Sequence, residues 1–352
     1  MVWISFILIL GRLWANELPA LLTKHSSETL RYISMDGRYA YVQKKPGVLG
    51  LVSSFRSIDF ITDNQNNDFL VTSSPYKGRL LIESIPDAHI EMNLHKNHKL
   101  SVVDYGNTVV RGVGFGRNPK LHLKDEWLTY YDTSSKVIRI ENLVTQKKYD
   151  IKLSKKAHPF FIPEVEMISS RAVIYSDINE NGYAALISYD LQNLKSAVIF
   201  KSSQSATRLE LCQNNQYLAV GEFPYDGVNR GSKIQTLSIK EFTNLSTFTT
   251  IYSTIDQDVG NIVCLPDYLY FVKTLSFDNQ LNMKITEAVK LDLKTQKLET
   301  KSNLKSVAQI IDMDGRILIP FRGAFYVLEG RANIGEDILK SIPNKEELQI
   351  DL

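Results

Sequence analysis

The sequence predicts an all-β fold assembled from a repeated antiparallel unit, and three observations support this. "ISMDGRYAYV" at residues 33–42 and "IDMDGRILIP" at residues 311–320 place the same polar turn between two apolar strands. Asp-Gly supplies the positive φ values that a tight hairpin turn needs, so each stretch predicts a β-hairpin. Related hairpins recur along the chain. No helical pattern longer than about three turns occurs before "GEDILKSI" near the C-terminus.

The spacing of these hairpins predicts the architecture. The first residues of the second strands lie between 41 (80 − 39) and 51 (268 − 217) residues apart. They are Tyr39, Leu80, Trp127, Ala172, Tyr217, Tyr268 and Ile317. A period of ~40–50 residues is typical of propeller blades. We therefore predict a seven-bladed β-propeller of four-stranded antiparallel blades, with blades starting near residues 30, 68, 119, 165, 208, 261 and 308.

The second half of each unit repeats as well. "ISYDLQNLKSAVIF" (187–200) and "VKLDLKTQKLET" (289–300) each contain a strand, Asp-Leu, a turn, Lys and a further strand. "RIENLVTQKKYDI" (139–151) follows the same pattern with Glu-Asn-Leu. Two hairpins in each unit predict four strands, which we call a to d from the inside of the ring outward.

The first hairpins resemble the Ser-Pro-Asp-Gly-Lys-Arg-Leu-Ala-Phe turn and strand of TolB-type, WD-like β-propeller repeats. The matching residues are Ser34, Asp36, Gly37, Arg38 and Ala40 in the first unit, and Ser74, Pro75, Gly78, Arg79 and Leu80 in the second. Tyr76-Lys77 replaces the usual Asp, and units three, four and six lack the Asp-Gly turn. The resemblance implies a propeller, and a cell-envelope component as a partner, but no activity, because propellers host many unrelated functions.

The N-terminus differs in composition from the rest of the chain. "MVWISFILIL" is apolar apart from Ser5, yet too short for a membrane span of ~20 residues. We predict a signal peptide over residues 1–15, cleaved near Leu13-Trp14-Ala15, and hence a periplasmic or secreted protein. No basic residue precedes the run and Arg12 follows it, so the alternatives are a buried N-terminal strand or a misassigned start. Residues 16–352 form a single propeller domain with a short C-terminal tail at 331–352.

Closure of the ring leaves two alternatives. The last unit shows three strands before Gly330-Arg331 but no fourth. The segment "LPALLTK" (18–24) is the preferred fourth strand, because it would join the two ends of the domain. The segment "ELQIDL" (347–352) is the competing candidate.

Two cysteines, Cys212 and Cys264, fall on the inner strands of neighbouring predicted blades. An oxidising compartment would allow them to pair. We favour two buried free thiols that pack as small hydrophobic side chains.

The overall charge argues against nucleic acid as a partner. The 41 basic and 39 acidic residues nearly cancel, whereas phosphate binding rests on an excess of Lys and Arg. We expect no cofactor, no transmembrane span and a monomer.

One face of the predicted ring carries the longer loops, because the b–c loops and the connections from each d strand to the next a strand meet there. "YGNTVVRGVGFGRNP" (105–119) is either a glycine-softened extra hairpin or a mobile binding loop presenting Arg111, Phe115 and Arg117. The Met-Asp-Gly-Arg turns lie on the opposite face, where turn chemistry and a surface charge explain them.

Two further loops on the same face supply candidate binding residues. "SKKAHPFFIPE" (154–164) contains His158, Phe160 and Phe161, which either plug against a neighbouring blade or form an exposed anchor. "FPYDGVNRGSK" (223–233) contributes Tyr225 and Arg230.

Signatures of catalysis and metal binding are weak. There is no Gly-x-Ser-x-Gly elbow, and "DINENG" (177–182) lacks the later carboxylate of a calcium loop, so we expect no catalytic residues and no metal site. We favour a binding or scaffold module for a protein or peptide over an enzyme. The alternative is a glycan or small-ester hydrolase or lyase at the channel mouth, which two converging carboxylates would favour.

Overall fold

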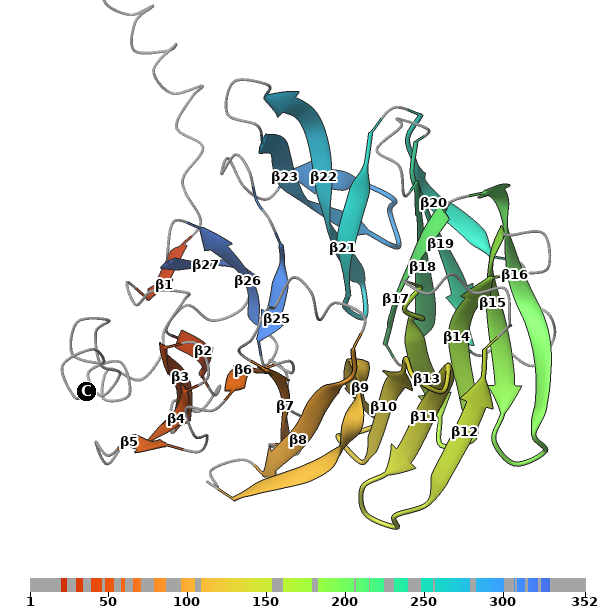
Figure 1. Ribbon diagram of the computed structural model, residues 1–352. Helices are drawn as coiled ribbons and strands as arrows, with labels where there is room; N and C mark the ends of the chain where they lie inside the picture. The colour runs from red at the N-terminus through yellow and green to blue at the C-terminus, as the bar shows by residue number, and fades with distance from the viewer. Residues whose placement is uncertain are drawn as a thin grey trace, which may run out of the picture.

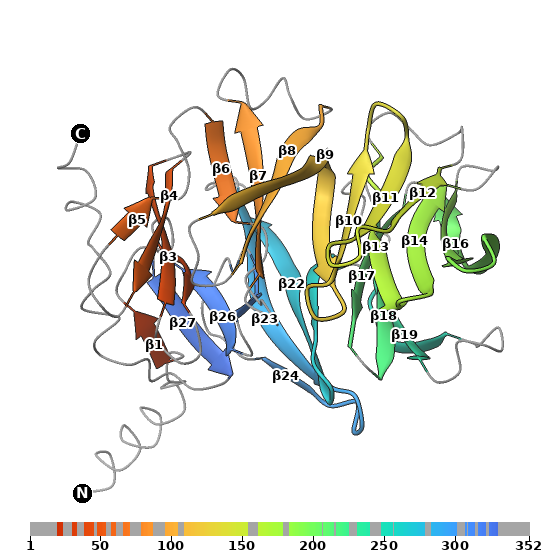
Figure 2. The same ribbon diagram turned by 90° about the horizontal axis from the view of Figure 1, so that it is seen from below.

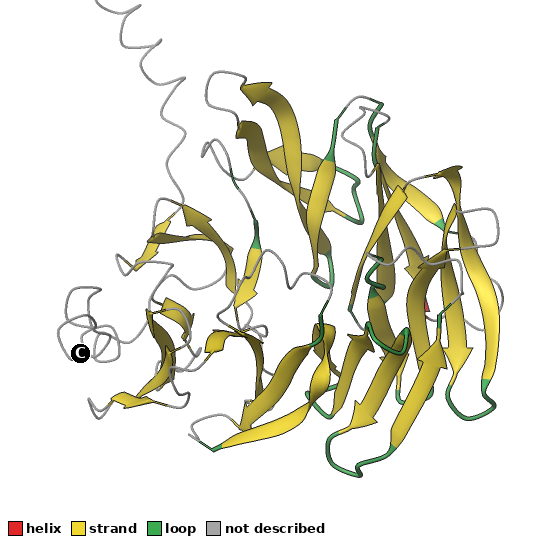
Figure 3. Ribbon diagram, in the orientation of Figure 1, coloured by secondary structure: helices red, strands yellow, loops and turns green. Residues whose placement is uncertain are grey.

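The computed structural model describes 27 strands (Figure 3). Apart from a short 3₁₀ turn at Ile239, every regular element among the described residues is a strand. The all-β prediction is confirmed. The described residues are 20–23, 30–33, 39–45, 48–53, 58–60, 66–70, 79–86, 96–104, 109–153, 161–178, 183–205, 207–214, 216–224, 231–239, 248–255, 257–278, 283–300, 307, 309–313, 316–321 and 324–329. No helix in these ranges has the length and hydropathy that a membrane span requires.

Five of the described sheets are four-stranded antiparallel blades. One comprises β2 (Leu30–Ile33), β3 (Tyr39–Lys45), β4 (Val48–Ser53) and β5 (Ile58–Phe60). The second blade comprises β13 (Val165–Ser169), β14 (Ala172–Ile178), β15 (Tyr183–Asp190) and β16 (Lys195–Ser205). The third comprises β17 (Thr207–Gln213), β18 (Tyr217–Pro224), β19 (Lys233–Ser238) and β20 (Thr249–Ser253). The fourth comprises β21 (Val259–Cys264), β22 (Tyr268–Asp278), β23 (Met283–Asp292) and β24 (Leu298–Thr300). The fifth comprises β1 (Ala20–Thr23) with β25 (Ile311–Met313), β26 (Arg316–Phe321) and β27 (Ala324–Glu329).

The sheets stand around a common centre, with strands such as β13, β17, β21 and β25 on the inner side (Figure 1). This arrangement is that of a β-propeller.

A sixth sheet has seven strands, so the prediction of seven separate four-stranded blades is wrong. Its strands are β6 (Asn66–Leu70), β7 (Arg79–Pro86), β8 (His98–Asp104), β9 (Val110–His122), β10 (Trp127–Asp132), β11 (Val137–Asn142) and β12 (Lys148–Lys152). The reason is β9, whose first half pairs with β8 and whose second half pairs with β10. Figure 2 shows β9 curving from one neighbour to the other. The second and third repeat units therefore share one strand without a turn between them.

Two glycines of β9 lie against the neighbouring strand β10. The described part of the segment 105–119, residues 109–119, is almost entirely strand and not a loop, and it pairs with β8 and then with β10. A Cβ on Gly114 would meet Tyr130 Oη at 2.5 Å, and one on Gly116 would meet Tyr130 Cδ2 at 2.4 Å. Glycine is needed because the Tyr130 ring lies directly on the strand.

The recurrent Asx-Leu pattern closes the turn between the third and fourth strands of a unit. A side-chain oxygen accepts backbone N–H bonds from the residues two and three positions later, at 2.7 to 3.0 Å. The residues concerned are Asn142, Asp190 and Asp292. These bonds form an Asx turn, and they lower the pKa of both aspartates. The leucine that follows donates its N–H to a carbonyl of the preceding turn, as Leu191 does to Arg171 at 2.8 Å.

The core lies between neighbouring sheets and follows the repeat. The residue after each predicted second-strand start is 0% exposed in six units. These residues are Leu81, Leu128, Val173, Leu218, Leu269 and Leu318. Burying one such side chain contributes roughly 1.5–3 kcal/mol. The cluster around Trp127 and Tyr131 of β10 also includes Met167 of β13 and Tyr175 of β14, so it joins two sheets.

The N-terminal segment closes the last blade. β1 pairs antiparallel with β27, with Ala20 opposite Val327 and Leu21 opposite Tyr326. The preferred alternative for ring closure, residues 18–24, is confirmed by its described part, residues 20–23. The competing segment at 347–352 lies outside the described residues.

The two cysteines form a disulfide, so the prediction of two free thiols is wrong. Cys212 on β17 and Cys264 on β21 have Cα atoms 5.8 Å apart. Their predicted placement on inner strands of neighbouring blades is correct, and that placement brings the sulfur atoms within bonding distance.

Arg316, from the second Met-Asp-Gly-Arg sequence, is not a surface charge. It is only 2% exposed and begins β26. The glycine before it and the equivalent first turn lie outside the described residues.

Candidate functional site

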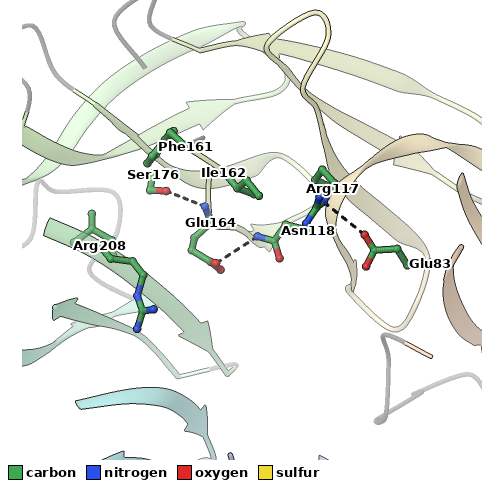
Figure 4. Close-up of a pocket in the computed structure, with 9 residues that line it drawn as sticks. Glu83, Arg117, Asn118, Phe161, Ile162, Glu164, Ser176 and Arg208 are labelled. Carbon is green, nitrogen blue, oxygen red and sulfur yellow. Dashed lines mark hydrogen bonds and ion pairs between the residues drawn. The ribbon is translucent and has the colours of Figure 1, made fainter. Parts of the chain in front are cut away.

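A cavity of about 390 Å³ lies where parts of four repeat units meet (Figure 4). Its lining residues are Glu83, Arg117, Asn118, Phe161, Ile162, Glu164, Ser176, Arg208 and Leu209. The volume is at the lower end of the ~300–1,000 Å³ range of ligand pockets.

The cavity lies on the loop-rich face. Arg117 and Asn118 sit where β9 passes from pairing with β8 to pairing with β10. Residues 161–164 immediately precede β13, and Arg208 is the second residue of β17. All three places are connections from an outer strand to the next inner strand, and these connections meet on one face of a propeller.

A β-bulge directs Asn118 to the next blade. Arg117 faces Tyr131 while Lys120 faces Thr129, so two residues of β9 oppose one of β10. Asn118 takes a φ of 48°, a left-handed conformation that asparagine tolerates. Its Nδ2 donates to the Pro163 carbonyl at 3.0 Å and to Glu164 Oε1 at 3.3 Å.

Glu164 is held from three sides. Its Oε2 lies 2.7 Å from Lys120 Nζ, and its backbone N–H donates to Ser176 Oγ at 2.8 Å. Lys120 also pairs with Glu166 at 3.1 Å. Burial alone would lower the pKa of Lys120, but the two glutamates overcome it and raise the pKa well above its usual range. The carboxylate of Glu164 is therefore positioned as an ion-paired acceptor.

A second ion cluster surrounds Arg117. Glu83 Oε1 lies 2.6 Å from His98 Nδ1 and 3.8 Å from Arg117 Nε. Arg117 Nη1 is 3.4 Å from His98 Nε2. A neutral His98 with its proton on Nδ1 satisfies both contacts, donating to Glu83 and accepting from Arg117. Arg117 is 16% exposed and Glu83 is 19% exposed, so this cluster is largely internal.

Arg208 is the more exposed cation of the site. Its side chain is 48% exposed, its Nη2 pairs with Glu210 Oε1 at 2.9 Å, and its Cζ lies 5.5 Å from the centre of the Phe223 ring. Burial raises the pKa of Glu210, Arg208 opposes that rise, and the charge of Glu164 reinforces it. In Figure 4, Arg208 and Arg117 approach from opposite sides, with Glu164 between them.

Only some of the predicted binding residues belong to this site. Arg117 and Phe161 line the cavity. Phe161 is 8% exposed and packs in the core cluster with Trp127, so it is a plug and not an exposed anchor. Arg111 and Phe115 are exposed on β9 and do not line the cavity, Phe115 being 62% exposed. His158, Phe160, Tyr225 and Arg230 lie outside the described residues.

Sequence reasoning missed Arg208 and Glu164. Glu164 closes the quoted loop "FFIPE", but Arg208 has no local signal, because "ATRLEL" is an ordinary strand with one charge. The site appears only when strands from different units meet.

The comparisons with known proteins identify the fold, but they identify no family and no function. No family model and no curated protein matches the chain. Tricorn protease is similar in structure, with a TM-score of 0.56 and 13% identity over 89% of this chain. This chain spans only 34% of the tricorn protease chain. Hydrazine synthase of Kuenenia stuttgartiensis gives a TM-score of 0.51 and 11% identity, covering 90% of this chain and 97% of that one.

TolB from Acinetobacter baumannii also matches, with 12% identity over 77% of this chain and 65% of that chain. Its TM-score of 0.46 is too low to carry an argument. The two stronger matches support a β-propeller fold.

Proposed function

We propose that the protein is a propeller module that binds a protein or peptide segment at the cavity on its loop-rich face. The observation that carries this proposal is the fixed arrangement of charges in the cavity. Glu164 and Arg117 are held in place by Lys120 and by the Glu83–His98 pair. A site whose polar groups are already ordered loses little side-chain entropy when a ligand binds.

The mixture of lining groups suits a peptide. Two guanidinium groups, two carboxylates, an amide and a hydroxyl match the charged and polar groups of a chain, and Phe161, Ile162 and Leu209 offer apolar contact. Pockets with an apolar wall and few fixed polar groups are typical ligand sites.

The alternative of a glycan or small-ester hydrolase or lyase has less support. Such an enzyme needs carboxyl groups that exchange protons near neutral pH. The two glutamates that line the cavity each face a cationic or proton-donating partner, Lys120 for Glu164 and His98 for Glu83. That pairing favours recognition over proton transfer.

We further propose that the protein acts outside the cytoplasm as a monomer, in the periplasm or as a secreted protein, with a cell-envelope component as its partner. The apolar run at residues 1–15 supports export. The Cys212–Cys264 disulfide also supports it, because such bonds persist in oxidising compartments.

Selection from a displayed peptide library on the immobilised protein tests the binding proposal. Peptides enriched by the wild type should be lost with Arg208→Glu and weakened with Glu164→Gln. Arg171→Glu is the matched control, since Arg171 is exposed on the turn between β13 and β14, on the opposite face. Enrichment of the same peptides by all four proteins would exclude this cavity as the binding site.

A further inference from the structure

The two arginines of the cavity differ in how much of each guanidinium is available. Arg117 is 16% exposed and lies against Glu83 and His98. Arg208 is 48% exposed, and among the described residues its one ion pair uses Nη2 and Glu210. A guanidinium carries five N–H donors in a planar fork. Arg208 therefore retains donors that a ligand in the cavity can reach.

The donors of Arg208 suit a carboxylate. A guanidinium binds a carboxylate through two parallel N–H bonds, which fixes both position and direction. The surrounding negative charge limits how much charge such a ligand can carry. Glu210 lies 2.9 Å from Arg208, and Glu164 is close enough to raise the pKa of Glu210. A singly charged group is tolerated here, whereas a doubly charged phosphate meets two glutamates.

The rest of the lining indicates which groups adjoin the carboxylate in the ligand. Ile162 is the partly exposed apolar residue of the lining, and the nearly buried Leu209 and Phe161, 4% and 8% exposed, form the packed base of the apolar side. Within the described part of the chain, Glu164 Oε1 accepts one bond, of 3.3 Å from Asn118, so it can accept a further N–H. One carboxylate, one apolar side chain and one amide N–H occur together at the C-terminal end of a peptide.

We infer that the cavity takes the free C-terminus of a peptide whose last side chain is apolar, with the terminal carboxylate bound to Arg208. This inference rests on the proposed peptide-binding function and specifies its ligand. The terminal side chain packs on the apolar side of the cavity formed by Ile162, Leu209 and Phe161, and the last peptide N–H donates to Glu164. An internal segment without an acidic residue lacks the carboxylate, whereas the C-terminal residue carries all three groups on a single residue.

A pair of synthetic peptides tests the inference. Fluorescently labelled Gly-Gly-Ala-Leu is prepared as the free acid and as the C-terminal amide, and fluorescence anisotropy gives the affinity of each. The wild type should bind the acid roughly 10- to 100-fold more tightly than the amide, the range expected for hydrogen bonds between charged groups. Arg208→Gln should remove this preference for the acid over the amide, Arg208→Lys should restore part of it, and the control Arg171→Gln should keep it.

The outcomes separate this inference from the proposed function. Equal affinity for acid and amide in the wild type, a preference that survives Arg208→Gln, or no binding of either peptide at millimolar concentration each overturns the inference. In those cases, peptides selected from the library in an Arg208-dependent manner would still support the binding function. Because Arg208 is half exposed, its variants should fold, which the melting temperature verifies.

Discussion

Replacing Cys212 and Cys264 together by alanine should lower the stability of the propeller by about 4 kcal/mol. The bond joins positions separated by 52 residues. In the chain-entropy account, a cross-link of this span removes about 14 cal/mol/K from the unfolded ensemble, or about 4 kcal/mol at 25 °C. An unfolding entropy of about 2.1 cal/mol/K per residue over 352 residues converts this to a fall of about 5–6 °C in melting temperature.

Differential scanning calorimetry with and without reductant measures this effect. Reductant should lower the melting temperature of the wild type to that of the double variant and should leave the double variant unchanged. The bond ties β17, which carries Arg208 and Glu210, to β21. Equal melting temperatures for the oxidised wild type, the reduced wild type and the double variant would refute the view that this link stabilises the ring.

Three other perturbations probe ring closure and the charged site. Deleting residues 16–27 removes β1, so the free energy of unfolding should fall by about 2–4 kcal/mol because the pairing with β27 is lost. A melting temperature equal to that of the wild type would contradict closure by this strand. Burial raises the pKa of Glu166, but Lys120 and His122 outweigh it and leave the pKa lowered, so Glu166 stabilises the fold above the unfolded-state pKa, ~4.3. This stability is lost as the pH falls through the lowered pKa; Glu166→Gln should therefore be less stable at pH 7 and lose less on acidification, as urea titrations would show. The affinity for the free-acid peptide should rise as the pH falls through the raised pKa of Glu210, because a neutral Glu210 no longer competes for Arg208 or repels the peptide carboxylate. Fluorescence anisotropy measures this pH dependence, which Glu210→Gln should flatten.

The pH prediction depends on every group that faces Glu210. Arg208 lies on the same strand, and Glu164 approaches from the residues immediately before β13. The backbone N–H groups of Asn261 and Ile262 on β21 donate to the carboxylate and favour its charged form. Burial and Glu164 outweigh these groups, so the pKa of Glu210 stays raised.

Local features of the fold were predictable because they depend on neighbouring residues. The Asx-Leu turns at Asp190 and Asp292 are closed by bonds within three residues, so the repeat shows them directly. The buried position after each second-strand start follows from the alternation of a strand, as Leu128 and Leu218 show.

The sequence predicted the face on which the candidate site lies, but only some of the residues that form it. The loop-rich face was expected, and Arg117 and Phe161 were among the expected residues. Phe161 belongs to the core because its loop runs directly into β13, so its ring packs between two sheets. Arg208 could not be found from sequence, since its role depends on Glu164 from another unit.

The amino-acid sequence alone specifies the hairpins, the repeat of 41 to 51 residues and the all-β class of this protein, because turn chemistry and strand alternation act over a few residues. The tertiary structure decides the fusion of two units through β9, the Cys212–Cys264 bond, closure by β1 and the composition of the cavity. Each of these depends on which distant segments meet, and that is set by packing of whole sheets around the ring.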